Sequence, residues 1–151
     1  MSAQAGRGDT RRMTNSALLV LRIVVGVTFL LHGLQKLGDL SGTEQFFASL
    51  SIPAPQLMSP LVAGTEAIGG LLLIAGLATP LAGAALAGDM LVAYATAHVT
   101  HGFFVADGGG ELVILLGGAC VALGLAGAGR YSLDAALSLP LVPVRRQEVA
   151  R

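Results

Sequence analysis

Seven ionisable side chains lie inside the long apolar stretches of this 151-residue sequence: Arg22, His32, Lys36, Glu66, Asp89, His98 and Glu111. An ionisable group in a membrane-spanning helix costs about 2.5–3.5 kcal/mol on insertion scales, so each one needs a partner or a purpose. Histidine and glutamate transfer protons readily, and imidazole titrates near neutral pH. The set therefore predicts either buried ion pairs or a site for proton chemistry.

The composition shows what kind of chain must position these groups. Apolar residues make up 54% of the chain and charged residues only 12%, whereas about a quarter of a soluble domain is charged. A soluble domain of this length could not hide so much apolar surface. We predict an all-α integral membrane protein.

The apolar runs are long enough for four membrane spans. About 20 helical residues, at 1.5 Å each, cross a hydrocarbon core of about 30 Å. The runs predict a four-helix bundle with spans at about 17–37, 57–78, 81–99 and 111–127. The whole chain then divides into a disordered basic arm, a four-helix transmembrane domain and a flexible basic tail, over residues 1–16, 17–139 and 140–151.

The connections between spans carry recognisable helix signals. Thr43 can cap a short helix that carries Phe46 and Phe47 and stops before Pro53. Such a helix would lie along the membrane surface or plug the mouth of the bundle. Thr79-Pro80 is typical of a helix cap followed by proline at the first helical position, which predicts a tight hairpin.

Basic residues indicate the orientation. Three of the nine lysines and arginines precede the first span and four follow the last one. An even number of spans places both termini on one side of the membrane. The positive-inside rule makes that side the cytoplasm.

With this orientation, polar residues from all four helices fall in the outer half of the bundle. Helical periodicity groups His32 with Lys36, and places Tyr94 and His101 on the face of His98. We predict catalytic roles for His32, Lys36, Glu66, His98 and Glu111, and ligand contacts from Arg22, Tyr94 and His101.

Three interpretations of these residues stay open. In the first, Lys36 pairs with Glu66 or Glu111, Arg22 pairs with Asp89, and the cluster only joins helices. In the second, the cluster is a pocket for a small redox-active ligand such as a quinone, to which histidine and glutamate relay protons. In the third, a glutamate joins the three histidines, His32, His98 and His101, on zinc or non-haem iron.

The single cysteine, Cys120, can form no intramolecular disulfide, and no C-x-x-C pair is present. Thiol-relay membrane oxidoreductases are therefore excluded, and Cys120 is expected to be a buried structural residue. The glycines lie within apolar helices rather than at a strand-to-helix turn, so no dinucleotide site is expected.

Several strings together resemble DoxX-family membrane proteins over about residues 17–137. The resemblance rests on the following segments: Arg22-Ile-Val-Val-Gly26 with Phe29, His32-Gly33 and Lys36; Pro53-Ala-Pro55; Glu66 with Gly69-Gly70; Gly76-Leu-Ala-Thr79; His98 before Gly102-Phe103-Phe104; Gly109-Gly110-Glu111; and Gly127-Ala-Gly129-Arg130-Tyr-Ser132-Leu-Asp134. One departure is Ala128, where the family commonly has proline.

The resemblance implies a four-helix, multi-pass protein of the inner (plasma) membrane. Some family members are linked to thiosulfate:quinone oxidoreductase, and others to complexes with superoxide dismutase and a sulfur-transfer protein in oxidative-stress defence. It also implies that Arg130 and Asp134 belong to the family motif, together with the polar residues of the spans.

These observations predict a membrane subunit of a quinone-linked or oxidative-stress/sulfur redox system. Its partners would be the lipid bilayer, redox proteins and a second copy of the chain, but no nucleic acid. The alternative is a non-enzymatic scaffold that anchors a redox partner complex. A transporter is a further alternative, although four spans without an inverted repeat would have to dimerise to build a path.

Overall fold

The structure is a computed structural model that describes residues 2–137. These residues form eight helical elements and no strand, which confirms the all-α fold. In chain order they are α1 (Ser2–Gly38), α2 (Leu40–Ser49), α3 (Pro55–Ala75), α4 (Thr79–Ala93), the π-helix η1 (Tyr94–His98), the 3₁₀-helix η2 (Val105–Asp107), α5 (Glu111–Ala126) and α6 (Leu133–Ala136).

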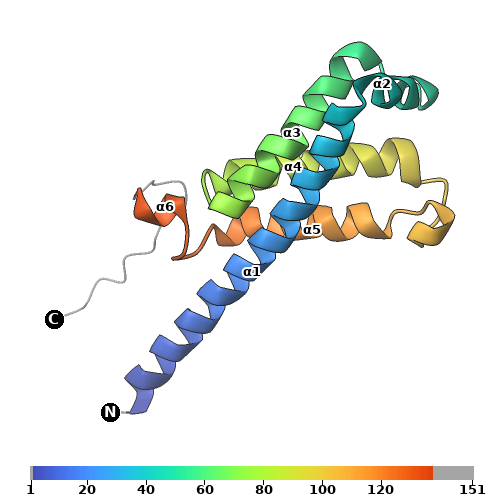
Figure 1. The fold of residues 1–151 in the computed structure, drawn as a ribbon. Coiled ribbons are helices and arrows are strands. Elements are labelled where there is room, and N and C mark those ends of the chain that lie inside the picture. The colour runs from blue at the N-terminus through green and yellow to red at the C-terminus, as the bar shows by residue number, and fades with distance from the viewer. Residues whose placement is uncertain (1, 138–151) are drawn as a thin grey trace.

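The first helix is longer than the sequence predicts. Residues 2–16, expected as a disordered arm, continue α1 and project beyond the other helices (Figure 1). Thr14 and Asn15 donate side-chain hydrogen bonds to carbonyls one turn earlier, and the Asn15 amide oxygen accepts the backbone N–H of Arg130 at 2.9 Å. These bonds support the helix where its sequence is polar. The tail at 140–151 lies outside the described residues.

Helices α1 and α3 lie side by side because glycine lets their backbones meet (Figure 1). A Cβ on Gly26 would lie 2.7 Å from the carbonyl oxygen of Gly70, and a Cβ on Gly70 would lie 2.6 Å from that of Gly26. Between apolar helices in lipid, close packing of small residues replaces the hydrophobic drive. This contact fixes the spacing of the helices that carry Lys36 and Glu66.

Helices α4 and α5 form the second closely packed pair, which crosses the first (Figure 1). One apolar core joins the two pairs and draws residues from all four helices. Its fully buried members include Phe29 of α1, Leu73 of α3, Leu86 of α4 and Leu123 of α5. The core therefore draws on α1, α3, α4 and α5, whereas a four-helix transmembrane bundle stays a prediction.

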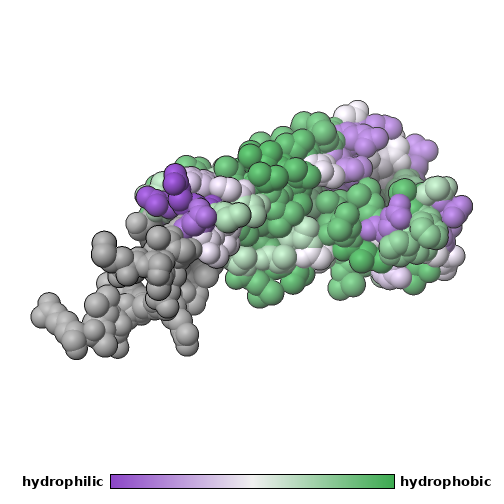
Figure 2. Space-filling view, turned by 90° about the horizontal axis from the view of Figure 1, so that it is seen from below, coloured by the Kyte–Doolittle hydropathy of each residue, from purple (hydrophilic) through white to green (hydrophobic). Residues whose placement is uncertain are grey.

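Three helical segments are long and apolar enough to cross a membrane: Asp9–Gly38, Pro55–Ala75 and Thr79–His98. The fourth, α5, is an apolar helix of 16 residues and is shorter than a usual span. Figure 2 shows a broad hydrophobic band between hydrophilic regions at the two ends of the molecule. The chain thus has the surface of a multi-pass membrane protein, whereas a fourth crossing stays a prediction.

Two predicted helix caps are wrong. The carboxylates of Asp39 and Asp134, and not the hydroxyls of Thr43 and Thr79, accept the backbone N–H groups at the starts of these helices. The short helix α2 begins after Asp39, whose carboxylate accepts the N–H of Gly42 at 2.8 Å, while Thr43 lies inside the helix. At the hairpin, Thr79 is a helical residue and the N-cap is Ala78. The carboxylate of Asp134 there accepts the N–H groups of Ala78 and Thr79, at 2.8 and 3.1 Å.

Candidate functional site

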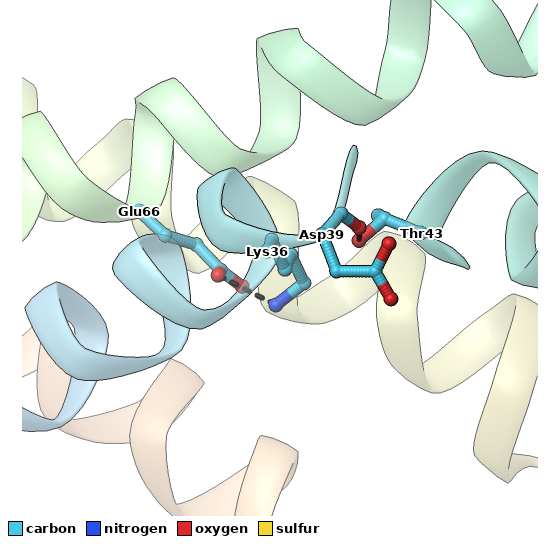
Figure 3. A network of polar contacts seen from close by, with 4 residues as sticks. All are labelled: Lys36, Asp39, Thr43 and Glu66. Carbon is cyan, nitrogen blue, oxygen red and sulfur yellow. Dashed lines mark hydrogen bonds and ion pairs between the residues drawn. The ribbon is translucent and has the colours of Figure 1, made fainter. Parts of the chain in front are cut away.

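An ion pair joins α1 to α3 near one end of the bundle. The ammonium of Lys36 lies 2.6 Å from Oε2 of Glu66, and Figure 3 shows the two side chains reaching toward each other. Glu66 is buried with 5% of its side chain exposed, whereas Lys36 is 25% exposed. This is one of the two pairings that the sequence predicts for Lys36, and it is confirmed.

A second carboxylate, that of Asp89 on α4, lies near this pair. It interacts electrostatically with both Glu66 and Lys36. Its Oδ2 atom is buried and has no hydrogen-bond partner among residues 2–137. One cation therefore faces two carboxylates in an apolar surrounding, where an unpaired charge is costly.

These groups line a cavity of about 300 Å³. That volume is at the lower end of the range for small-molecule sites. Most of the wall is apolar, and the polar groups are few and close together. The charged and imidazole groups of the wall are His32, Lys36, Glu66, Asp89 and His98, and its larger apolar side chains include Phe29, Phe46, Phe47, Met58, Met90 and Leu116.

A change of helix type brings His98 to the same cavity as Asp89. The two residues are nine positions apart, which in an α-helix puts them about 180° apart around the axis. The π-helix η1 (Tyr94–His98) lies between them and widens the turn. Short π-helical segments are frequent at functional sites. Both side chains line the cavity as a result.

The hydrogen bond of His98 fixes the tautomer of its neutral ring. Nδ1 lies 2.7 Å from the carbonyl oxygen of Gly108. A carbonyl can only accept, so Nδ1 carries a proton and Nε2 of the neutral ring is a free acceptor. His32 also lines the cavity, is half-buried and makes no hydrogen bond through its ring within the described part of the chain. Both imidazoles can therefore engage a ligand.

Helix α2 closes one side of the cavity. Phe46, Phe47 and Leu50 contribute to its wall, as does Ile52 just after the helix. Asp39 makes two hydrogen bonds to the first turn of this helix. Its carboxylate accepts the N–H of Gly42, and its backbone carbonyl accepts the hydroxyl hydrogen of Thr43 at 2.9 Å (Figure 3). The predicted short helix is therefore present, one turn from Lys36, and it lines the cavity, whereas its position relative to the membrane stays a prediction.

Arg22 lies at the other end of the bundle and does not pair with Asp89, contrary to the structural interpretation of the sequence. Its guanidinium is 1% exposed and donates to the carbonyls of Ala128 and Tyr131 at 2.9 and 2.7 Å. Backbone carbonyls after α5 hold this cation instead of a carboxylate, with Asp134 near enough for electrostatic attraction. Arg22 is thus outside the cavity.

Three more of the predicted site residues lie outside the cavity wall. Tyr94 lines a separate groove between α4 and α5, with its ring against Gly110. His101 is exposed in the loop that follows η1, and Glu111 is half-buried at the start of α5. The structure therefore brings together His32, Lys36, Glu66 and His98, and adds Asp89.

No group of three histidine, cysteine, aspartate or glutamate side chains among residues 2–137 is arranged to hold a metal ion. Cys120 is a free, fully buried thiol in the core, as the sequence predicts.

Comparison with known proteins identifies the family. The DoxX family profile matches residues 17–99. The chain is 35% identical to "Putative oxidoreductase CatD" of Bacillus subtilis, over 77% of this chain and 83% of that protein. It is 30% identical to "Inner membrane protein YqjF" of Escherichia coli, over 85% of this chain and 97% of that protein.

A second Escherichia coli protein, "Inner membrane protein YphA", is 29% identical over 78% of this chain and 87% of its own length. No solved structure matches the chain. The family profile, these relatives and the long apolar helices agree with one another. This chain belongs to the DoxX family and is a multi-pass protein of the inner (plasma) membrane.

Proposed function

We propose that this protein is the quinone-binding membrane subunit of an oxidative-stress or sulfur redox system, with four membrane crossings and both termini in the cytoplasm. The observation that carries the proposal is the apolar cavity with its small polar cluster. The printed name of the Bacillus subtilis relative, which includes "oxidoreductase", supports a redox role.

The shape and chemistry of the cavity suit a quinone head group. Its ring needs apolar and aromatic walls, and its two oxygens need hydrogen-bonding groups on the ring edge. Phe29 and Phe47 supply the first, while Lys36 and His32 can supply the second. A quinone, when bound, supplies a two-electron, two-proton redox couple.

The residues of this chain would bind the ring and move protons, while a partner supplies the electrons. Glu66 and Asp89 can exchange protons with the ring oxygens, and Nε2 of His98 is a free acceptor in the neutral tautomer. The sequence contains no dinucleotide-binding motif. We therefore place the thiol or thiosulfate donor on a redox protein partner.

Replacement of two cavity residues tests this role. Glu66→Gln and His98→Ala should fold and reach the membrane, yet lose most of the quinone reduction that a thiol or thiosulfate donor drives in native membranes. Glu44→Gln changes a carboxylate on α2 that does not line the cavity and is the matched control. Unchanged turnover in both cavity variants contradicts the proposal.

The second candidate function is a scaffold that anchors a redox complex without chemistry of its own. The Lys36–Glu66 pair favours the scaffold role, because it joins α1 to α3 and would stabilise the packing of these helices even in a protein without chemistry of its own. A scaffold with Glu66→Gln should lose thermal stability but retain its partner proteins wherever it still folds. An enzyme subunit should keep its partners and lose turnover.

A further inference from the structure

The polar groups of the cavity contain more hydrogen-bond acceptors than donors. Lys36 is the one ammonium of the cavity wall, and one of its three N–H groups donates to Glu66. Asp89 presents a buried oxygen without a hydrogen-bond partner in the described residues, and His98 presents Nε2 after its other nitrogen has bonded to Gly108. A buried acceptor without a donor loses the hydrogen bond that it makes in water, so the cavity favours a ligand that brings donors.

The two redox forms of a quinone differ in this respect. The oxidised ring carries two carbonyl oxygens, which only accept hydrogen bonds, whereas the reduced ring carries two hydroxyl groups, which also donate. A hydroxyl can give its hydrogen to the free oxygen of Asp89 or to Nε2 of His98. A carbonyl oxygen at the same place would face another acceptor.

Charge points in the same direction. Lys36 is the one cation beside two carboxylates, so Lys36, Glu66 and Asp89 together offer no excess positive charge. An anion such as thiosulfate finds no free cation among these three groups, and its own charge would have to leave water for an apolar wall. The anionic sulfur donor therefore needs a different surface.

We propose that this cavity binds the hydroquinone form in preference to the quinone, through Asp89 and His98. The proposal rests on the quinone-binding function proposed above and specifies which redox form the site selects. Asp89 is the binding residue that distinguishes the two forms, because its buried Oδ2 has no hydrogen-bond partner among residues 2–137.

Such a preference would change the driving force of the reaction. The balanced half-reaction is quinone plus two electrons and two protons to hydroquinone, with the electrons taken from the thiol or thiosulfate donor of the partner. Tighter binding of the reduced form makes the bound quinone a stronger oxidant. For a two-electron couple, a tenfold preference corresponds to about 30 mV.

The test compares the affinity of one short-chain benzoquinone with that of its hydroquinone. Full-length protein in nanodiscs is stripped of endogenous quinone and titrated under anaerobic conditions with each form. We expect the hydroquinone to bind the wild-type protein at least tenfold more tightly. Asp89→Asn, whose amide can donate to a carbonyl, should reduce that ratio to about one, while Asp107→Asn, outside the cavity, should retain it.

Two outcomes overturn this inference and are distinguishable. Equal affinities, or tighter binding of the quinone, in the wild-type protein refute the preference and leave the quinone-binding function intact. Failure of both forms to bind refutes the quinone-binding function, and the preference with it. The wild-type ratio decides the matter even when Asp89→Asn does not fold.

Discussion

Lys36 holds Glu66 at 2.6 Å on one wall of the cavity, so its replacement by methionine removes the cation and leaves two carboxylates facing each other. Loss of one partner from a buried pair costs about 3–5 kcal/mol. Because Lys36 is partly exposed, we expect Lys36→Met to lower unfolding stability by an amount near the low end of that range.

Thermal unfolding in detergent micelles measures the effect. Lys36→Met combined with Glu66→Gln removes both charges and should recover much of the lost stability. Arg12→Met removes an exposed cation from α1 and should leave the melting temperature unchanged. A melting temperature equally unaffected by Lys36→Met would show that the pair does not stabilise the fold.

Some contacts of individual residues can be predicted from the sequence, and others cannot. Lys36 and Glu66 carry opposite charges in the first two apolar helices, so the sequence predicts their pairing as one of two alternatives, the other being Lys36 with Glu111. The partners of Arg22 are backbone carbonyls, which have no residue-type signature. The sequence predicts Asp89 as the partner of Arg22, which is wrong. The π-helix that brings Asp89 and His98 to one cavity leaves no clear pattern in the sequence.

Among the elements, the turn between α3 and α4 depends on one glycine. Gly76 ends α3 with φ +66°, and a Cβ there would overlap Nη1 of Arg22 and crowd Ser132. The left-handed conformation costs an L-residue about 1–2 kcal/mol before any clash. We expect Gly76→Ala to destabilise the protein by more than this amount.

Gly88→Ala is the matched control for that substitution. Gly88 lies in α4 with open space around it, so alanine should be neutral or stabilise the helix by about 0.5–1 kcal/mol. Urea or thermal unfolding of both variants gives the comparison. Equal stability of the two variants would contradict the tight contact of Arg22 with this turn.

The apolar runs predict α3, α4 with η1, and α5 to within a few residues, because each is an apolar helix that satisfies its own backbone hydrogen bonds. The N-terminal part of α1 and the helix caps were predicted wrongly. Two of these errors have long-range causes: Asn15 binds the Arg130 backbone, and Asp134 caps a helix 55 residues earlier in the chain. The cap of α2 is local, with Asp39 in the position that the sequence predicts for Thr43. Only the folded structure brings such residues together.

For the whole molecule, the distribution of basic residues predicts a testable orientation. A fluorescent protein fused to the C-terminus should fluoresce, because it stays in the cytoplasm. Alkaline phosphatase inserted in the loop at Asp107 should be active, since that loop should lie outside. An external C-terminus would mean that the 16-residue helix α5 does not cross the membrane.

The cavity is the feature of the whole molecule on which its proposed function depends, and co-purification tests it most directly. The wild-type protein and the Phe29→Trp variant are extracted with native lipid, and their bound small molecules are quantified by mass spectrometry. The larger ring of tryptophan should occupy part of the cavity. We predict quinone enriched above the bulk lipid in the wild-type protein and depleted in the variant. Quinone at the bulk lipid level in both preparations would contradict a quinone site in this cavity.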